Sequence, residues 1–123
     1  MPADRIDESC STQGQNLAAR MIQMVRLRKT DPHAALLVDV LGIKIADAQD
    51  ESISNRLRIL RQLNAALLVM REWGRNGNWL YDVNRHLNIK AAWNAELTAL
   101  SGRLWTMDDE QIVAAQAVLN QAA

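Results

Sequence analysis

Apolar residues recur at helical spacing along most of the chain, and no stretch gives a convincing β-strand pattern. The first periodic run passes through Leu17, Met21 and Met24. It stops at Thr30, because Asp31 suits the N-cap of a following helix and Pro32 suits its first position. The pattern therefore predicts an all-α protein.

The segment 32–73 carries the longest apolar stripe and contains no proline after its first residue. As one continuous helix it would be about 60 Å long at ~1.5 Å per residue, a length typical of a coiled coil or a helical hairpin. We expect such a long helix, with a coiled-coil tendency. The alternative is two helices broken in the polar stretch 47–52, with Ser52 or Ser54 as the cap.

Shorter helices are expected in the second half of the chain. The sequence Gly-Arg-Asn-Gly-Asn at 74–78 predicts a turn, with the glycine after Trp73 as a helix C-cap. A short amphipathic piece at 80–87 and a helix at 89–99 follow. The last helix is expected at 107–121, with Thr106 beginning a capping box.

The first sixteen residues are polar and show no periodicity. We expect a disordered leader at 1–16, followed by a single helical domain at 17–123. A frayed start to the first helix fits the same composition.

Composition removes several function classes. Fourteen Lys and Arg balance fourteen Asp and Glu, which argues against a grip of the whole protein on nucleic acid or an anionic membrane. The chain has no Phe, which favours aliphatic packing between helices. It shows no Sec-type signal and no apolar run of the ~18 residues that a membrane span needs.

No motif predicts a catalytic, cofactor-binding or metal site. Cys10, His33 and His86 share no ligand spacing, and the acidic run 108–110 suits a helix N-terminus. Neither a nucleophile motif nor a glycine-rich phosphate loop is present. We therefore expect a protein that is not an enzyme, has no small-molecule substrate and needs no cofactor.

Arginine dominates the positive charge, and three arginines lie close together on the predicted long helix: Arg56, Arg58 and Arg61. They fit a solvated helix face. They also leave open an alternative function, a small cytoplasmic helical regulator that binds nucleic acid or an acidic protein through this Arg-rich face.

Two further features allow two interpretations each. Trp73 and Trp79 bracket the turn, and Trp105 precedes the last helix. They are either interface anchors or a small core beneath the turn. Asn64 either sets the register of a helix pairing or lies at the margin of the stripe.

Three segments, in order, resemble the filament and needle-tip (translocon filament) proteins of type III secretion systems. The parts 43–50 and 61–67 are similar to that family's long N-terminal helix, which ends in a Leu-Asn-x-x-Leu pattern. The part 81–89 is similar to its short middle segment, and 109–119 to its Ala-rich helix. The resemblance covers about residues 17–123, and its weight lies in the order of the segments.

The resemblance implies a structural or assembly protein of a type III secretion system. Such a protein forms or assists an extracellular filament or needle tip, and is secreted through the apparatus from a cytoplasmic pool held by a chaperone. The chain departs from the family because the long C-terminal helix is missing after Ala123. We therefore expect a shortened relative or a fragment, whose apolar stripe lacks its usual intramolecular partner.

The expected partners are a second copy of the chain, a secretion chaperone or an apparatus protein. The stripe is the expected association surface, and replacing its Leu60 by Asp should abolish association while leaving much helicity. The residues expected to make this contact are Leu36, Ile43, Ile53, Leu57, Leu60, Asn64 and Leu67.

Overall fold

The computed structural model describes the backbone of residues 2–121 and the side chains of residues 16–121. It contains six α-helices, one 3-10 helix and, over residues 2–121, no strand. The all-α prediction is confirmed, and the coiled-coil tendency stays a prediction. The helices are α1 (Pro2–Thr30), α2 (Pro32–Leu41), α3 (Ile45–Gln49), α4 (Ile53–Asn76), α5 (Val83–Ser101), the 3-10 helix η1 (Leu104–Thr106) and α6 (Asp109–Gln121).

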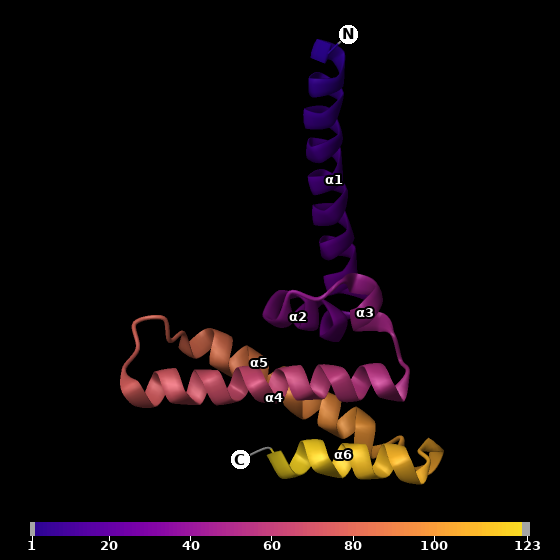
Figure 1. The fold of residues 1–123 in the computed structure, drawn as a ribbon, viewed down its shortest axis with the longest axis vertical. Helices are drawn as coiled ribbons and strands as arrows, with labels where there is room; N and C mark the ends of the chain where they lie inside the picture. The colour runs from indigo at the N-terminus through magenta and orange to yellow at the C-terminus, as the bar shows by residue number, and fades with distance from the viewer. Residues whose placement is uncertain (1, 122–123) are drawn as a thin grey trace.

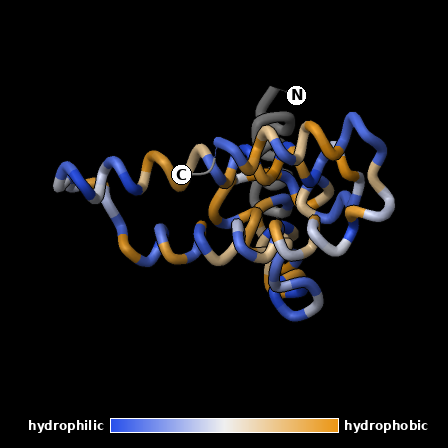
Figure 2. Tube along the Cα trace, turned by 90° about the horizontal axis from the view of Figure 1, so that it is seen from below, coloured by the Kyte–Doolittle hydropathy of each residue, from blue (hydrophilic) through white to orange (hydrophobic). Residues whose placement is uncertain are grey.

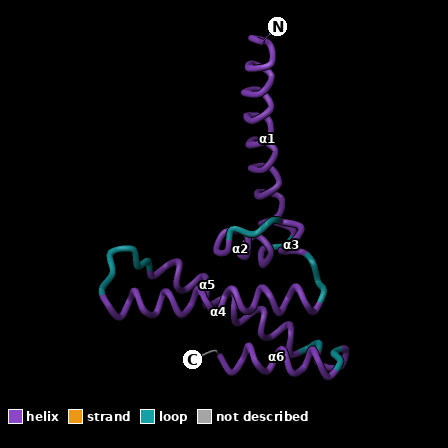
Figure 3. Tube along the Cα trace, viewed as in Figure 1, coloured by secondary structure: helices purple, strands orange, loops and turns teal. Residues whose placement is uncertain are grey.

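The molecule consists of a helical body, formed by α2 to α6, and a projecting helix, α1 (Figure 1). Within the body, α4 runs through the middle, α5 packs across it, and α6 packs along its other side (Figures 1 and 3). Only the last turns of α1 reach the body, where they contact α2. Figure 2 shows hydrophobic (orange) and hydrophilic (blue) positions interspersed along the helices of the body.

The segment 32–73 forms three helices, so the expectation of one long helix is wrong. The first break lies at Gly42, which has φ +67° and donates its N–H to the Val38 carbonyl at 2.9 Å. Because this left-handed conformation favours glycine, a single glycine suffices to end α2. The second break lies at 50–52, inside the polar stretch of the two-helix alternative.

Side-chain hydrogen bonds hold the second break in place. The Ser52 N–H donates to Asp50 Oδ1 at 3.0 Å, and this bond is the largest cause that lowers the pKa of Asp50 below its ordinary value of 3.8. Asn55 Nδ2 donates to the carbonyls of Asp47 and Asp50 at 2.7 and 2.9 Å. These bonds satisfy backbone groups that a continuous helix would have paired internally.

The two breaks fold α2 and α3 back over α4, which then buries apolar residues on two adjacent sides. The first core cluster joins the end of α1 to α2, α3, α4 and α5 around Leu37, Ile59, Leu63 and Ile89. The second cluster joins α4 to the end of α5 and to α6 around Leu57, Leu60, Leu100 and Val118. The apolar stripe of the sequence therefore finds its partners within the same chain.

Helix boundaries confirm several predictions and shift others. Asp31 accepts from the Ala34 N–H at 3.1 Å with Pro32 in the first turn, as predicted. The C-cap of α4 is Gly77, with φ +64°, rather than Gly74. Gly74 lies inside α4 beneath Tyr81, and a Cβ there would stand 3.1 Å from the tyrosine ring.

The later helices also differ from their predicted limits. The short piece at 80–87 and the helix at 89–99 are one helix, α5, which Asp82 caps by accepting from the Asn84 and Arg85 N–H groups. The capping box of α6 is formed by Asp108 and Gln111, whose side chains each accept from the other's backbone N–H at 2.8 and 3.1 Å. It therefore starts two residues after Thr106.

The first helix includes the segment expected as a leader. The described backbone is helical from Pro2 onward, so α1 includes residues 2–16, and the disordered leader at 1–16 stays a prediction. Proline is well suited to a first helical turn, and the sequence places Asp4, Asp7 and Glu8 near the N-terminus of the helix dipole. Met1 lies outside the described residues.

Candidate functional site

The predicted association residues lie in or beside the core. Five of the seven are buried, and they all belong to α4: Ile53, Leu57, Leu60, Asn64 and Leu67. Leu36 and Ile43 are partly buried and pack against the first cluster. Residues chosen for contact with a partner therefore pack against the chain's own helices.

The structure divides the Arg-rich face. Arg56 is buried at 8% exposure and bonded to two carboxylates, whereas Arg58 and Arg61 are exposed. The Arg58 guanidinium donates to Asn55 Oδ1 at 2.6 Å and lies 3.9 Å from Asp47. One of the three arginines is thus unavailable to an external partner, and a second is held beside an acidic residue.

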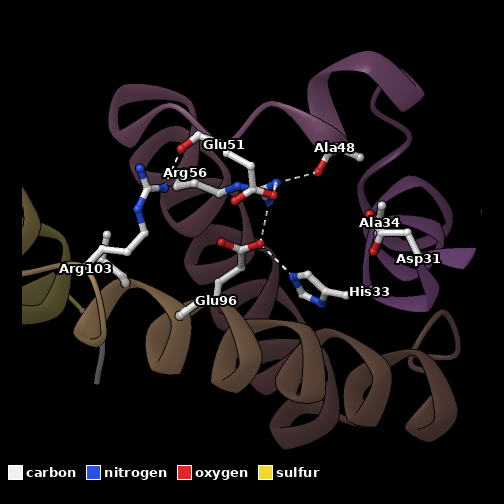
Figure 4. Close-up of a pocket in the computed structure, with 10 residues that line it drawn as sticks. Asp31, His33, Ala34, Ala48, Glu51, Arg56, Glu96 and Arg103 are labelled. Atoms are coloured by element: carbon white, nitrogen blue, oxygen red, sulfur yellow. Dashed lines mark hydrogen bonds and ion pairs between the residues drawn. The ribbon is translucent and has the colours of Figure 1, made fainter. Parts of the chain in front are cut away.

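Arg56 is the centre of a buried charge cluster that links four helices (Figure 4). Its Nη1 donates to Glu96 Oε1 at 2.8 Å, and its Nη2 donates to the Ala48 carbonyl at 2.7 Å and to Glu51 at 3.0 Å. His33 Nε2 lies 2.6 Å from the same Glu96 oxygen, and the tautomer with a hydrogen on Nε2 donates to it. The cluster holds α2, α3, α4 and α5 together.

A cavity of about 100 Å³ adjoins the cluster. Its rim includes Asp31, His33, Arg56, Glu96 and Arg103, and the last of these donates to the Glu51 carbonyl. This volume exceeds the roughly 10–15 Å³ that a single ordered water needs. Arg56 Nε is buried without a hydrogen-bond partner, so the cavity suits an ordered water that accepts from it.

The sequence analysis missed Glu96, although the sequence carries a signal for it. Glu96 lies seven residues after Ile89 and four before Leu100, on the face that α5 buries. A carboxylate on a buried helix face requires a cationic partner, and Arg56 is that partner. The cluster accordingly acts as an internal joint, since both charges are satisfied within the chain.

Four large apolar side chains of α1 are exposed. Leu17, Met21, Ile22 and Val25 are each more than half exposed, at 60, 64, 53 and 51%. Their spacing places them on one broad side of the helix. We call these four residues the α1 face. A shallow groove of about 370 Å³ runs along it, bordered by Arg26 and Lys29.

The C-terminal end of α1 anchors the helix to the body. Leu27 is buried at 5% exposure, and Met24 packs against the first core cluster. Arg28 lies 3.7 Å from Asp39 of α2 in an exposed ion pair. The helix is thus held at its C-terminal end, and the exposed residues of the α1 face lie mainly on the N-terminal side of these contacts.

Other exposed apolar residues are spread around the body. Trp79, Leu80, Val83 and Leu87 lie at the start of α5 and the turn before it, and Trp105 is 93% exposed in η1. Trp73 instead packs against the first core cluster. The tryptophans around the breaks therefore divide between one core residue, Trp73, and two surface residues, Trp79 and Trp105.

The described residues also bear on metal and membrane binding. Among them, no group of three or more His, Cys, Asp or Glu side chains is placed to hold a metal ion. None of the helices in this part of the chain combines the length and the apolar character that a bilayer span demands.

Comparisons with models of protein families, with curated proteins and with solved structures found no match to this chain.

Proposed function

We propose that this chain is a non-enzymatic assembly protein, whose helical body presents α1 for packing against another helix. The observation that carries the proposal is the α1 face, where four large aliphatic side chains are more than half exposed on a projecting helix. Contiguous apolar surface of this kind is typical of association sites. The association surface that we propose is therefore the α1 face, in place of the stripe on α4 that the sequence predicted.

The anchoring of α1 supports this role. Leu27 and Met24 fix one end of the helix, so the α1 face is presented on a preformed element and binding orders few additional residues. The helix-in-groove and helix-pairing modes of recognition both use residues at spacings of three and four, as in Leu17, Met21 and Val25. The buried charge cluster around Arg56 and Glu96, the joint between α2, α3, α4 and α5, also supports this role, because it stabilises the body that carries α1.

We propose a type III secretion system as the setting of this assembly role. The support is the order of the three segments that resemble filament and needle-tip proteins. In a cell that carries such an apparatus, the chain should reach the medium only when the secretion machinery is active. Retention in the cytoplasm would remove this setting and leave the assembly role to be tested separately.

Site-specific photo-crosslinking in the native host tests the assembly role. A photoreactive amino acid in place of Met21 should give a discrete adduct, and the same residue in place of Ala65, exposed on α4, should not. Adding Val25→Glu should abolish the adduct at position 21, because it places a charge in the contact. A chain without any adduct at position 21, or with equal adducts at both positions, would contradict the proposed function.

A further inference from the structure

We propose that the partner helix that covers the α1 face is acidic, with Asp and Glu side chains on both flanks of its apolar stripe. This inference rests on the proposed function and names the chemistry of the partner. Charge complementarity carries it, because oppositely charged flanks select and orient a partner while the apolar residues supply most of the contact.

The part of α1 with described side chains has an excess of positive charge. Residues 16–30 contain four cationic side chains and no Asp or Glu, although the whole chain carries fourteen of each sign. Arg28 forms the exposed ion pair with Asp39. Within residues 16–121, the exposed side chains of Arg20, Arg26 and Lys29 make no ion pair or hydrogen bond. These three cations are therefore available to a partner.

The cations border the α1 face on both sides. At about 3.6 residues per turn, the four aliphatic side chains form an arc around the helix from Leu17 to Ile22. Arg26 comes one turn after Ile22 and borders the arc on that side, where it lines the shallow groove together with Lys29. Arg20 comes three residues after Leu17 and borders the arc on the other side. A helix laid along the α1 face would therefore bring both of its flanks against cations.

A cleft beside α1 extends the same combination onto the body. It has a volume of about 520 Å³ and lies between α1 and the turn that joins α2 to α3. Its charged lining residues are Arg20 and Lys44, and no described carboxylate lines it. Met24, in its wall, lies three residues from Met21, so the cleft adjoins the α1 face. Its aliphatic lining is half-buried and consists of Met24, Val38, Ile43 and Ile45.

Two other occupants fit these features less well. The same segment of a second copy would set cations against cations, because residues 16–30 contain no Asp or Glu. An anionic membrane would match the charge, but a flat bilayer cannot reach into a cleft that the α2–α3 turn walls off at the end of the projecting helix (Figure 1). An acidic amphipathic helix matches both the aliphatic lining and the cations.

Binding of two synthetic peptides to the purified full chain tests the charge of the partner. Both peptides are amphipathic helices with the same leucine stripe, and their flanking positions are Glu in one and Lys in the other. In fluorescence anisotropy at low salt, the Glu peptide should bind at least about tenfold more tightly, because each of three exposed ion pairs contributes a factor of about two to three. The difference should shrink as salt is added, since exposed charges are screened.

Charge reversal on α1 identifies the contact. The double variant Arg26→Glu, Lys29→Glu should lose the preference for the Glu peptide, because it removes two of the cations. The double variant Arg61→Glu, Lys90→Glu is the matched control, since it changes the net charge equally at exposed positions that line none of the grooves around α1. Met21→Glu should weaken the binding of both peptides, because it places a charge in the apolar contact.

Several results would overturn the proposal. These are equal affinities for the two peptides, tighter binding of the Lys peptide, no binding of either peptide, or an equal loss of preference in the control variant. Binding to phosphatidylserine vesicles that Arg26→Glu, Lys29→Glu removes, without binding of the Glu peptide, would identify an anionic membrane as the occupant instead.

The proposal and the assembly role fail in distinguishable ways. A photo-crosslinked adduct at position 21 whose partner segment is rich in Asp and Glu supports both. An adduct with a second copy of the chain, or with a segment that has no such excess, keeps the assembly role and overturns the acidic helix. The absence of any adduct at position 21 overturns the assembly role itself.

Discussion

Helices α1 and α4 carry similar apolar patterns and have opposite surroundings. α4 buries residues on two adjacent sides, one against α2 and α5 and the other against α6. α1 buries only Leu27 among its described residues and leaves the α1 face open. The contrast teaches that helical periodicity identifies a face that must be covered, whereas the breaks in the chain decide whether the same molecule covers it.

The breaks produce this difference. Gly42 and the stretch 50–52 reverse the chain twice, which brings α2 back over α4. The single residue Asp31 separates α1 from α2, and no later helix returns along the length of α1 (Figure 1). Helix α4 therefore lies in the core, whereas α1 keeps an exposed apolar face.

The largest effect is expected from a charge in α4. Leu60 is 1% exposed, so Leu60→Asp buries an unpaired carboxylate and should cost at least about 4 kcal/mol of the free energy of unfolding. Most of the helicity should then be lost, whereas the same substitution in an exposed stripe would leave much of it. Met21→Glu on α1 should change the same free energy by less than about 0.5 kcal/mol. Urea unfolding followed by circular dichroism measures both, and equal losses would erase the contrast between the helices.

The next largest effect concerns the joint that fixes α5 on α4. Glu96→Ala leaves the buried Arg56 guanidinium without its main partner and should cost about 3–5 kcal/mol. Glu51→Ala removes the exposed partner of the same arginine and should cost at most about 1 kcal/mol. The midpoints of urea unfolding test the pair. A Glu96→Ala chain as stable as the wild type would mean that apolar packing alone holds α5.

A smaller effect is expected at the break that folds α2 back. Gly42 has φ +67° with no atom within 4 Å of an added Cβ, so Gly42→Ala adds backbone strain of about 1–2 kcal/mol without a clash. Gly102→Ala serves as the control, since Gly102 has ordinary right-handed helical angles. Thermal unfolding should show a lower midpoint for Gly42→Ala than for the wild type, and no lower midpoint for Gly102→Ala.

The smallest effect is a pH dependence at the second break. Because hydrogen bonds from Ser52 lower the pKa of Asp50 in the folded chain, this carboxylate stabilises the fold above its ordinary pKa of 3.8, and the contribution disappears as pH falls through the lower folded value. Asp50→Asn should therefore differ slightly from the wild type at neutral pH and converge with it below pH 3.8. Unfolding midpoints measured between neutral and acidic pH would show a constant difference if Asp50 had no such role.

Local signals in the sequence predicted the elements better than their arrangement. Asp31 and Pro32 identify the start of α2, since a cap acts through its own neighbours. The end of α2 at Gly42 was missed, because an isolated glycine in a helical pattern is compatible with both a break and a continuous helix. The all-α class followed from periodicity alone.

The candidate sites needed information that no local pattern holds. Glu96 and Arg56 are forty residues apart, and only the crossing of α5 over α4 makes them partners. The residues of the predicted association stripe were correctly identified as apolar and helical. Their burial depends on α2, α5 and α6, which the sequence analysis treated as separate small helices.

The projecting helix also controls how the molecule moves through water. A compact chain of 123 residues has a radius of gyration of about 14 Å. Because α1 projects from the body and is about 43 Å long, the radius of gyration of this chain should be larger. Hydrodynamic friction is therefore that of an elongated particle, and the 13.8 kDa monomer should leave a size-exclusion column ahead of a globular protein of equal mass.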